Sequence, residues 1–478
     1  MRIFVWFSAF TSVAAFSLAP RRLLSPPTTS LQAQTVADAT ESSTPVKDTT
    51  TNSDNTDQSP GMRENAVFEC DESVYFWRDF QRQGLATTAA NVQHLAEITQ
   101  RFTTRYGPAG LDHWWRYVGR SAYFMTNAAL GVVANNLHDR LVNRNNGSDG
   151  NPFVSGIQSA ASRLVLEAAL VCEEDFLAIQ KGLYRKPYDM FEASRQRSPL
   201  YYAPQTVRFV REAVGALTRR KRQAEEDKQI WLGASTELYP DYYLNNFHYQ
   251  TDGWFSAESA ATYEVSTETL FLGRQDAMQR TALPVLLEHS KRIRGRPMRV
   301  LEIACGTGRF MTFCRDNLPR DAEYTAIDLS PFYLEKAREN DNEWRRLRRD
   351  SNIAPAQLIQ TKAENLPFQA EKFDAVLCVY LFHELPREIR SQVVQEMSRV
   401  VKPGGVVILT DSLQKGDRPV LDKNIGNFQN MNEPFYTDYI EDYLPDHFAR
   451  AGLKPISKTV RSVTKTLAFK KPNVLKEN

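Results

Sequence analysis

The residues best suited to ligand chemistry are gathered in Val300–Phe310, which has the sequence VLEIACGTGRF. A short apolar run ends in the turn Gly306-Thr307-Gly308, and an amphipathic helical pattern follows at once. A glycine lets the backbone approach a ligand where any Cβ would intrude. Strand, glycine turn and helix in this order predict that a nucleotide-like ligand meets the carboxyl end of a parallel strand.

A second group of polar and aromatic side chains precedes this turn. The segment from Tyr239 onward gathers His248, Tyr249 and Trp254 around a glycine, and Tyr263 follows shortly after. Loops of this composition often belong to binding sites. A packed connector whose side chains cap neighbouring helices fits the same pattern equally well. On the first interpretation, His248, Tyr249, Trp254 and Tyr263 are candidate substrate-binding residues.

These residues need a scaffold, and the hydrophobic periodicity indicates one. Strand-like and helix-like segments alternate after residue 296, which predicts an α/β fold with a doubly wound, mostly parallel, seven-stranded sheet. Residues 66–235 have helical spacing and should form a preceding all-α domain, with 236–295 as a connecting loop and helices over the site and 296–478 as the sheet domain. The predicted strands are Met298–Ala304, Tyr324–Leu329, Gln357–Gln360, Phe373–Phe382, Val406–Asp411, Lys454–Arg461 and Val463–Lys470, the last two forming a hairpin.

Five motifs in order carry a family resemblance. LEIACGTGR, DLS (328–330), AENLPF (363–368), FDAV (373–376) and RVVKPGG (399–405) resemble those of class I S-adenosylmethionine-dependent methyltransferases with a Rossmann-like sheet. The quinone-biosynthesis type is the most similar. FHYQTDGW, FHELP and NEPFY (432–436) also resemble a methyltransferase group of cyanobacteria and plastids. The resemblance implies S-adenosylmethionine as cofactor and methyl transfer to a small metabolite such as a quinone, a phenol or an isoprenoid-like compound.

The resemblance also assigns roles to individual residues. Asp328 should accept hydrogen bonds from both ribose hydroxyls, because one carboxylate has two oxygens. The turn should pass along the methionine part, with Glu302 fixing the loop or the ammonium group. Lys362 stands where relatives often carry an aspartate for the adenine amino group, and a charged lysine cannot accept that hydrogen bond. The predicted cofactor-binding residues are Glu302, Ala304, Gly306, Gly308, Asp328, Leu329, Ala363 and Glu364.

His383 is the candidate catalytic residue. It follows the fourth predicted strand, at the sheet edge where acceptors of this family bind, and a histidine pKa near ~6.5 suits a general base. Our hypothesis is that His383, with Tyr380 or His248, orients or deprotonates the acceptor. A histidine that caps the strand-to-helix turn is an equally good interpretation. No metal site is predicted, because His383 lacks a second histidine four places on and the five cysteines include no C-x-x-C pair.

Other classes of protein fit less well. A dinucleotide-binding turn needs a third glycine where this chain has Met311. The net charge of +2 gives no general argument for nucleic acid, so we expect a small-molecule acceptor and no nucleic-acid partner. Peripheral association with a membrane is left open, and the oligomeric state is not predicted. The alternative function is an S-adenosylmethionine-binding scaffold or regulatory protein that docks a partner through its helical domain.

The amino terminus has the composition of a targeting sequence. Residues 1–15 contain an apolar run after Arg2 and predict a signal peptide. The following Phe16-Ser-Leu-Ala-Pro20 resembles the junction of bipartite presequences in algae with complex plastids. Residues 16–65 should therefore comprise a transit peptide and a disordered linker, because they are rich in Ser, Thr, Pro, Gln and Asp. The expected location is the plastid stroma, with the secretory pathway as the alternative.

Overall fold

The computed structural model describes residues 59–81, 88–142, 152–190, 199–222, 238–250, 252–348 and 353–473. The predicted signal peptide and most of the predicted transit peptide and linker lie outside these ranges. The last residues of that linker differ from the prediction: Pro60–Glu64 forms helix α2, and Glu64 is fully buried. A polar composition suggested disorder here, but the Glu64 carboxylate has buried lysine partners. Among the described residues, no helix is long and apolar enough to cross a membrane.

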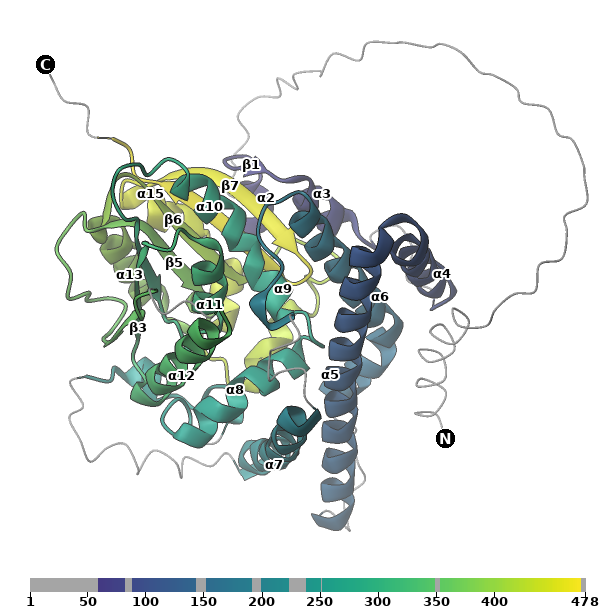
Figure 1. The fold of residues 1–478 in the computed structure, drawn as a ribbon. Coiled ribbons are helices and arrows are strands. Elements are labelled where there is room, and N and C mark those ends of the chain that lie inside the picture. Colours follow the sequence, from purple (N-terminus) through teal and green to yellow (C-terminus); the bar gives the residue numbers. More distant parts are fainter. Residues whose placement is uncertain are drawn as a thin grey trace, which may run out of the picture. The chain divides into compact units, whose positions relative to one another are not determined.

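A single mixed sheet forms the centre of the fold (Figure 1). It has eight strands in the order β1-β7-β8-β6-β5-β2-β3-β4, and β8 is antiparallel to both β6 and β7 while the other pairs are parallel. The doubly wound sheet and the closing hairpin are therefore as predicted. The strands are β1 (Glu69–Cys70), β2 (Arg299–Ile303), β3 (Glu323–Asp328), β4 (Gln357–Gln360), β5 (Phe373–Val379), β6 (Val401–Ser412), β7 (Lys454–Arg461) and β8 (Thr464–Lys470).

The eighth strand corrects two expectations. The sequence predicted seven strands and only helices before the sheet, yet β1 pairs in parallel with β7 through Glu69–Ser457 and Cys70–Lys458. Without β1, β7 would be the edge of the sheet and would leave unpaired N–H and C=O groups. A two-residue extended segment satisfies part of that edge, and it is too short to show a periodicity of two.

The helices cover both faces of the sheet, and residues of β5 alternate between the two cores. Ala375 and Leu377 pack with α10, α11 and α12, whereas Val376 and Cys378 pack with α13, α14 and α15. The helices are α3 (Glu72–Asp79), α4 (Thr88–Gln100), α5 (Gly107–Val142), α6 (Pro152–Gln180), α7 (Pro199–Arg222), α8 (Ala257–Leu270), α9 (Gln275–Gln279), α10 (Leu283–Ser290), α11 (Arg309–Asn317), α12 (Pro331–Arg348), α13 (Arg387–Val400), α14 (Tyr436–Glu441) and α15 (Leu444–Arg450).

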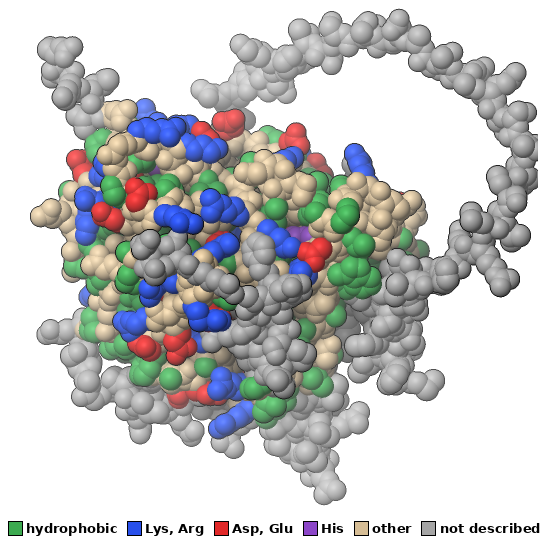
Figure 2. All heavy atoms as spheres, in the orientation of Figure 1, with side chains coloured by type: hydrophobic (Ala, Val, Ile, Leu, Met, Phe, Trp, Pro, Cys, Tyr) green, Lys and Arg blue, Asp and Glu red, His purple; other side chains and the backbone are tan. Residues whose placement is uncertain are grey.

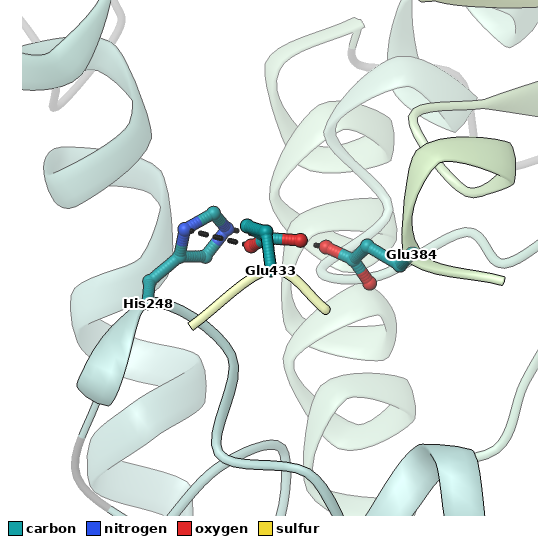
Figure 3. A group of neighbouring side chains, drawn as sticks. All are labelled: His248, Glu384 and Glu433. Carbon is teal, nitrogen blue, oxygen red and sulfur yellow. Dashed lines mark ion pairs between the residues drawn. The ribbon is translucent and has the colours of Figure 1, made fainter. Parts of the chain in front are cut away.

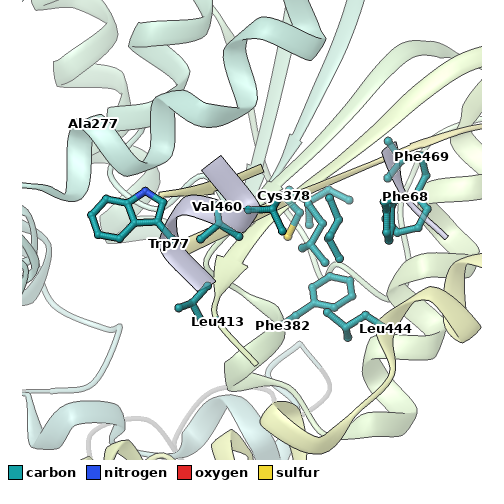
Figure 4. Packing of buried hydrophobic residues seen from close by; sticks show 14 of the residues in the cluster. Phe68, Trp77, Ala277, Cys378, Phe382, Leu413, Leu444, Val460 and Phe469 are labelled. Carbon is teal, nitrogen blue, oxygen red and sulfur yellow. The ribbon is translucent and has the colours of Figure 1, made fainter. Parts of the chain in front are cut away.

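The amino-terminal segment packs into the same core as the last strands. Phe68 lies against Phe469 of β8 with ring centroids 5.2 Å apart, and Trp77 of α3 is completely buried beside Val460 of β7 (Figure 4). Apolar burial of this kind contributes about 1.5–3 kcal/mol per large side chain. The first described residues therefore belong to the core around the closing hairpin.

Buried ion pairs join the amino-terminal helices to the sheet. Glu64 of α2 lies 2.9 Å from Lys458 Nζ and 2.6 Å from Lys465 Nζ. Asp175 of α6 pairs with Arg280 at 2.7 Å. The outer face drawn in Figure 2 differs, because basic and acidic side chains are interspersed there with apolar ones. These pairs tie distant parts of the chain together inside the molecule.

Candidate functional site

The glycine turn joins β2 to α11 with three residues at positive φ. Ala304 (φ 54°), Gly306 (φ 54°) and Gly308 (φ 72°) reverse the chain within five residues. A Cβ on Gly306 would meet only Tyr333, at 4.0 Å, so that side of the turn is open. A Cβ on Gly308 would lie 2.8 Å from the Cβ of Ala337. Gly306 thus keeps a cavity open, whereas Gly308 allows α12 to pack closely.

Asp328 ends β3 directly opposite this turn. Its Oδ2 accepts a hydrogen bond from the Gly306 N–H at 2.8 Å, and its Oδ1 accepts one from the Ser330 N–H at 2.9 Å. Burial raises the pKa of Asp328 to about 6, and these N–H groups oppose the rise. A carboxylate has about four lone-pair positions, so two remain for a ligand. Asp328, which is predicted to bind the ribose diol, is thus held in place by two backbone N–H groups and can still accept two hydrogen bonds from a ligand.

One cavity collects most of the predicted cofactor-binding residues. Gly308 and Glu364 are the exceptions. Gly308 packs on α12, and the Glu364 carboxylate accepts a hydrogen bond from the Tyr242 hydroxyl at 2.9 Å. Tyr242 itself lines the cavity, beside Thr361 and Lys362. The predicted residues that line the cavity are Glu302, Ala304, Gly306, Asp328, Leu329 and Ala363.

Glu302 is buried in the floor of this cavity. Its Oε2 accepts a hydrogen bond from the Tyr324 hydroxyl at 2.7 Å, and only 1% of the residue is exposed. Burial raises the pKa of Glu302 to about 8, although the tyrosine hydrogen bond lowers it. A carboxyl group in this state is ready to ionise when a cationic group of a ligand is placed beside it.

An aromatic wall continues the cavity beyond the turn. Trp254 and Tyr263, both predicted, lie edge to face with the ring of Tyr333, at centroid distances of 5.6 and 5.4 Å. Phe247 packs on Trp254 at 6.0 Å, and all four rings line the cavity together with Tyr243. The side chain of Tyr249 lies outside the described part of the structure. The wall offers a large apolar surface with a few polar edges.

The two predicted catalytic residues occupy different positions. The Tyr380 ring lines the cavity, but its hydroxyl hydrogen-bonds Thr464 Oγ1 at 2.6 Å. His383 does not line the cavity, and its Nδ1 lies 2.6 Å from Asp411 Oδ1. Burial disfavours the charged imidazole, but the charge and hydrogen bond of Asp411 outweigh burial and raise the pKa of His383. The neighbour of His383 along the chain, Glu384, lines the cavity in its place.

His248 lies in a group with two glutamates, of which Glu433 is buried while His248 and Glu384 are partly exposed (Figure 3). The 3-10 turns Phe247–Tyr249 and Phe382–Glu384 carry His248 and Glu384, and Glu433 follows a third. His248 Nδ1 is 3.0 Å from Glu433 Oε1, and His248 Nε2 is 4.0 Å from Glu384 Oε1. Burial lowers the pKa of His248 to about 4 and raises those of Glu384 and Glu433. His248 itself is not among the residues that line the cavity.

Sequence reasoning missed several residues of this site. Tyr333 lies in the first turns of α12 and Arg309 begins α11, and both line the cavity. Both residues follow shortly after a predicted strand, and this position in the sequence could have identified them as site residues. Arg309 is paired with Asp276 at 2.6 Å, so its charge is already neutralised. Glu384 and Glu433 stood inside the quoted FHELP and NEPFY motifs, but nothing in the sequence showed that these motifs meet.

Comparisons with known proteins identify the domain around the turn. Residues 300–405 match a family described as "Methyltransferase domain". The fatty-acid O-methyltransferase of Mycolicibacterium smegmatis is 36% identical over 121 residues, which are 25% of this chain and 39% of that protein. The demethylmenaquinone methyltransferase of Desulfitobacterium hafniense is 30% identical over 164 residues, which are 33% of this chain and 61% of that protein.

The chain thus spans about two fifths to three fifths of these relatives. Among solved structures, the CurJ carbon methyltransferase aligns with 81% of this chain and 99% of its own length, at 13% identity and a TM-score of 0.39.

The match over residues 300–405, the sheet and the cavity together support a methyltransferase domain whose cofactor is S-adenosylmethionine. Two observations show that the cavity suits this cofactor. Asp328 offers two free acceptor positions for a vicinal diol, and the open side of Gly306 leaves room for backbone contact. Glu302 also lines the cavity. Similarity to small-molecule methyltransferases covers this domain and leaves the amino-terminal helices without a counterpart in the family match.

Proposed function

We propose that this protein is an S-adenosylmethionine-dependent methyltransferase that acts on a small lipophilic acceptor, such as a quinol, a phenol or an isoprenoid-linked ring. The observation that carries the proposal is the aromatic wall, which extends the cofactor cavity with Tyr243, Phe247, Trp254 and Tyr263. Flat, apolar walls with few polar groups are typical of sites for aromatic small molecules. The named relatives act on fatty acids and on demethylmenaquinone, which agrees with this choice.

The residues of the chain perform a limited set of tasks in this reaction. The cofactor supplies an electrophilic methyl group on a sulfonium, so the protein must mainly position the acceptor and exclude water. Asp328 and the turn at Gly306 would hold the cofactor in line with the wall. Trp254 and Tyr263 would stack against the acceptor and keep the site dry.

A hydroxylated acceptor must also lose a proton, and Glu384 is better placed than His383 to receive it. Glu384 lines the cavity, and its pKa is raised by burial, so the carboxylate is a stronger base than usual. His383 stands behind it, with Nε2 3.8 Å from Glu384 Oε1 and Nδ1 on Asp411. We therefore assign His383 a positioning role. This assignment revises the hypothesis that His383 acts directly on the acceptor.

The test is methyl transfer from labelled S-adenosylmethionine to a panel of hydroquinones, phenols, prenylated rings and fatty acids. We expect label in a lipophilic product. Phe247→Leu should raise the KM for that acceptor by about tenfold, because part of a large apolar contact is lost. The Kd for S-adenosylmethionine should stay unchanged in this variant. If the protein binds S-adenosylmethionine but transfers no methyl group to any acceptor of the panel or to a plastid extract, the alternative function of a cofactor-binding scaffold is favoured. The plastid location stays a prediction, and an import assay with isolated plastids would test it.

A further inference from the structure

One group of neighbouring side chains is not explained by cofactor binding. His248, Glu384 and Glu433 each offer one ligand atom, and these atoms all lie within 4.8 Å of one another. Figure 3 shows the three side chains pointing toward a common point from three separate chain segments. Ligand atoms bound about 2.0–2.2 Å from one ion lie at most about 4.4 Å apart, so these three atoms need to approach one another only slightly. The spacing therefore suits a shared cation after small side-chain movements.

Glu433 has an unsatisfied carboxylate in this group. Its side chain is 1% exposed, and neither oxygen has a hydrogen-bond partner among the described residues. The Oε1 atom lies 3.0 Å from His248 Nδ1, yet these two atoms do not form a hydrogen bond. Within the described chain, no lysine or arginine forms an ion pair with Glu433 or Glu384. A buried carboxylate without hydrogen-bond donors, as at Glu433, is costly unless a cation neutralises it.

The group is held in place by asparagines. Asn432 Nδ2 donates to the Asn246 carbonyl at 2.6 Å, and Asn245 Nδ2 donates to the Asn432 carbonyl at 3.1 Å. These bonds tie the loop of His248 to the loop of Glu433. His248 itself has a φ of 57°, a conformation that is uncommon for a residue other than glycine. The loops thus bring the imidazole to the carboxylates at some conformational expense.

We propose that His248, Glu384 and Glu433 bind a divalent transition-metal cation. One imidazole nitrogen and two carboxylate oxygens are ligands for Zn²⁺ and Mn²⁺, and the imidazole disfavours Mg²⁺ and Ca²⁺. Two carboxylates also balance the charge of the ion. Three protein ligands leave a coordination position open, as in catalytic rather than structural metal sites.

The position of Glu384 gives this site a role in acceptor selection. Glu384 lines the cavity, so the open coordination position would lie at its rim. With the ion bound, Glu384 acts as a ligand and no longer as the acceptor of the substrate's proton. This part of the inference rests on the proposed function. A cation there would favour acceptors with an oxygen ligand, such as the hydroxyl of a phenol or a quinol, over acceptors that are purely hydrocarbon. The chemical class of the acceptor is then a hydroxylated ring.

The test is titration of the metal-stripped full chain with Mn²⁺, followed by electron paramagnetic resonance of the free ion, and competition by Zn²⁺. We expect one site per chain. Glu433→Gln keeps the shape but removes a ligand charge, and should weaken Mn²⁺ binding at least tenfold, since even the loss of an outer-shell partner costs about 10–100-fold. His248→Asn is the second variant, because asparagine tolerates positive φ. It should weaken binding similarly.

The matched control is His289→Asn, which removes another buried histidine, on α10. It should bind Mn²⁺ like the wild type. S-adenosylmethionine titration of every variant checks that the fold and the cofactor site persist. The proposal is overturned if the wild type shows no saturable binding at millimolar metal, or if both site variants bind like the control. Methyl transfer with unchanged acceptor preference in the metal-stripped protein would refute the role of the metal in acceptor selection and leave the proposed function intact.

Discussion

Replacing Asp328 with asparagine separates its two roles at the end of β3, which are to hold the backbone of the turn and to bind the cofactor diol. In the wild type, each carboxylate oxygen accepts one backbone N–H, from Gly306 at 2.8 Å and from Ser330 at 2.9 Å, and keeps a free acceptor position. An asparagine retains one oxygen and presents an NH₂ group to the other backbone N–H. It therefore loses one contact to the cofactor diol. A hydrogen bond to a charged group contributes about 1.5–3 kcal/mol, which corresponds to a 10- to 150-fold rise in Kd.

Calorimetric titration with S-adenosylmethionine measures this effect directly. The control is Asp321→Asn, an exposed acidic residue just before β3, which should leave Kd unchanged. Because burial raises the pKa of Asp328 to about 6, wild-type affinity should fall as the pH drops through that value, when the carboxyl gains a proton and loses acceptor capacity. The variant should lack this fall. A Kd change below about threefold, or an equal change in the control, would refute the assigned role of Asp328.

Two further predictions concern buried carboxyl groups. Burial raises the pKa of Glu302 to about 8, so binding of the cofactor should release a proton from Glu302, and affinity should increase as the pH rises toward 8. Glu302→Gln should abolish this proton release. Calorimetry in buffers of different ionisation enthalpy measures the release. Equal proton release in both proteins would contradict the ammonium contact. Glu64→Gln leaves Lys458 and Lys465 facing Asp417 alone and should lower the free energy of unfolding by about 3 kcal/mol in chemical denaturation. The exposed Glu69→Gln is its control, and equal stability of the two variants would refute the argument.

The sequence predicted strand bounds well where the flanking segments mark both ends of the strand. Gln357–Gln360 and Lys454–Arg461 have the predicted bounds, since polar or glycine-containing segments flank them. The fourth predicted strand extended to Phe382, but β5 ends at Val379. Tyr380 has a φ of 55° and turns the chain, although Tyr380, Leu381 and Phe382 continue the apolar run. Hydrophobicity alone could not show this change of direction.

The candidate site was predictable where its residues follow a strand and hidden where distant segments meet. Asp328 could be found because it ends a strand after a glycine turn. Glu433 could not, because its neighbours His248 and Glu384 come from other loops, and a single sequence contains no record of that contact. The same limit applied to Glu64, whose charge looked like part of a polar linker until Lys465 was placed beside it.

The pairing of Glu64 with Lys465 also constrains the order of events during synthesis. The two residues are 401 positions apart, so α2 leaves the ribosome long before its buried partners exist. At about 5–20 residues per second, this interval lasts roughly 20–80 s. During that time β1 has no neighbouring strand, and the rings of Phe68 and Trp77 have no core to enter. Closure of this fold therefore has to wait until β7 and β8 have been synthesised, and the nascent amino-terminal segment is a natural client for chaperones that hold apolar chain.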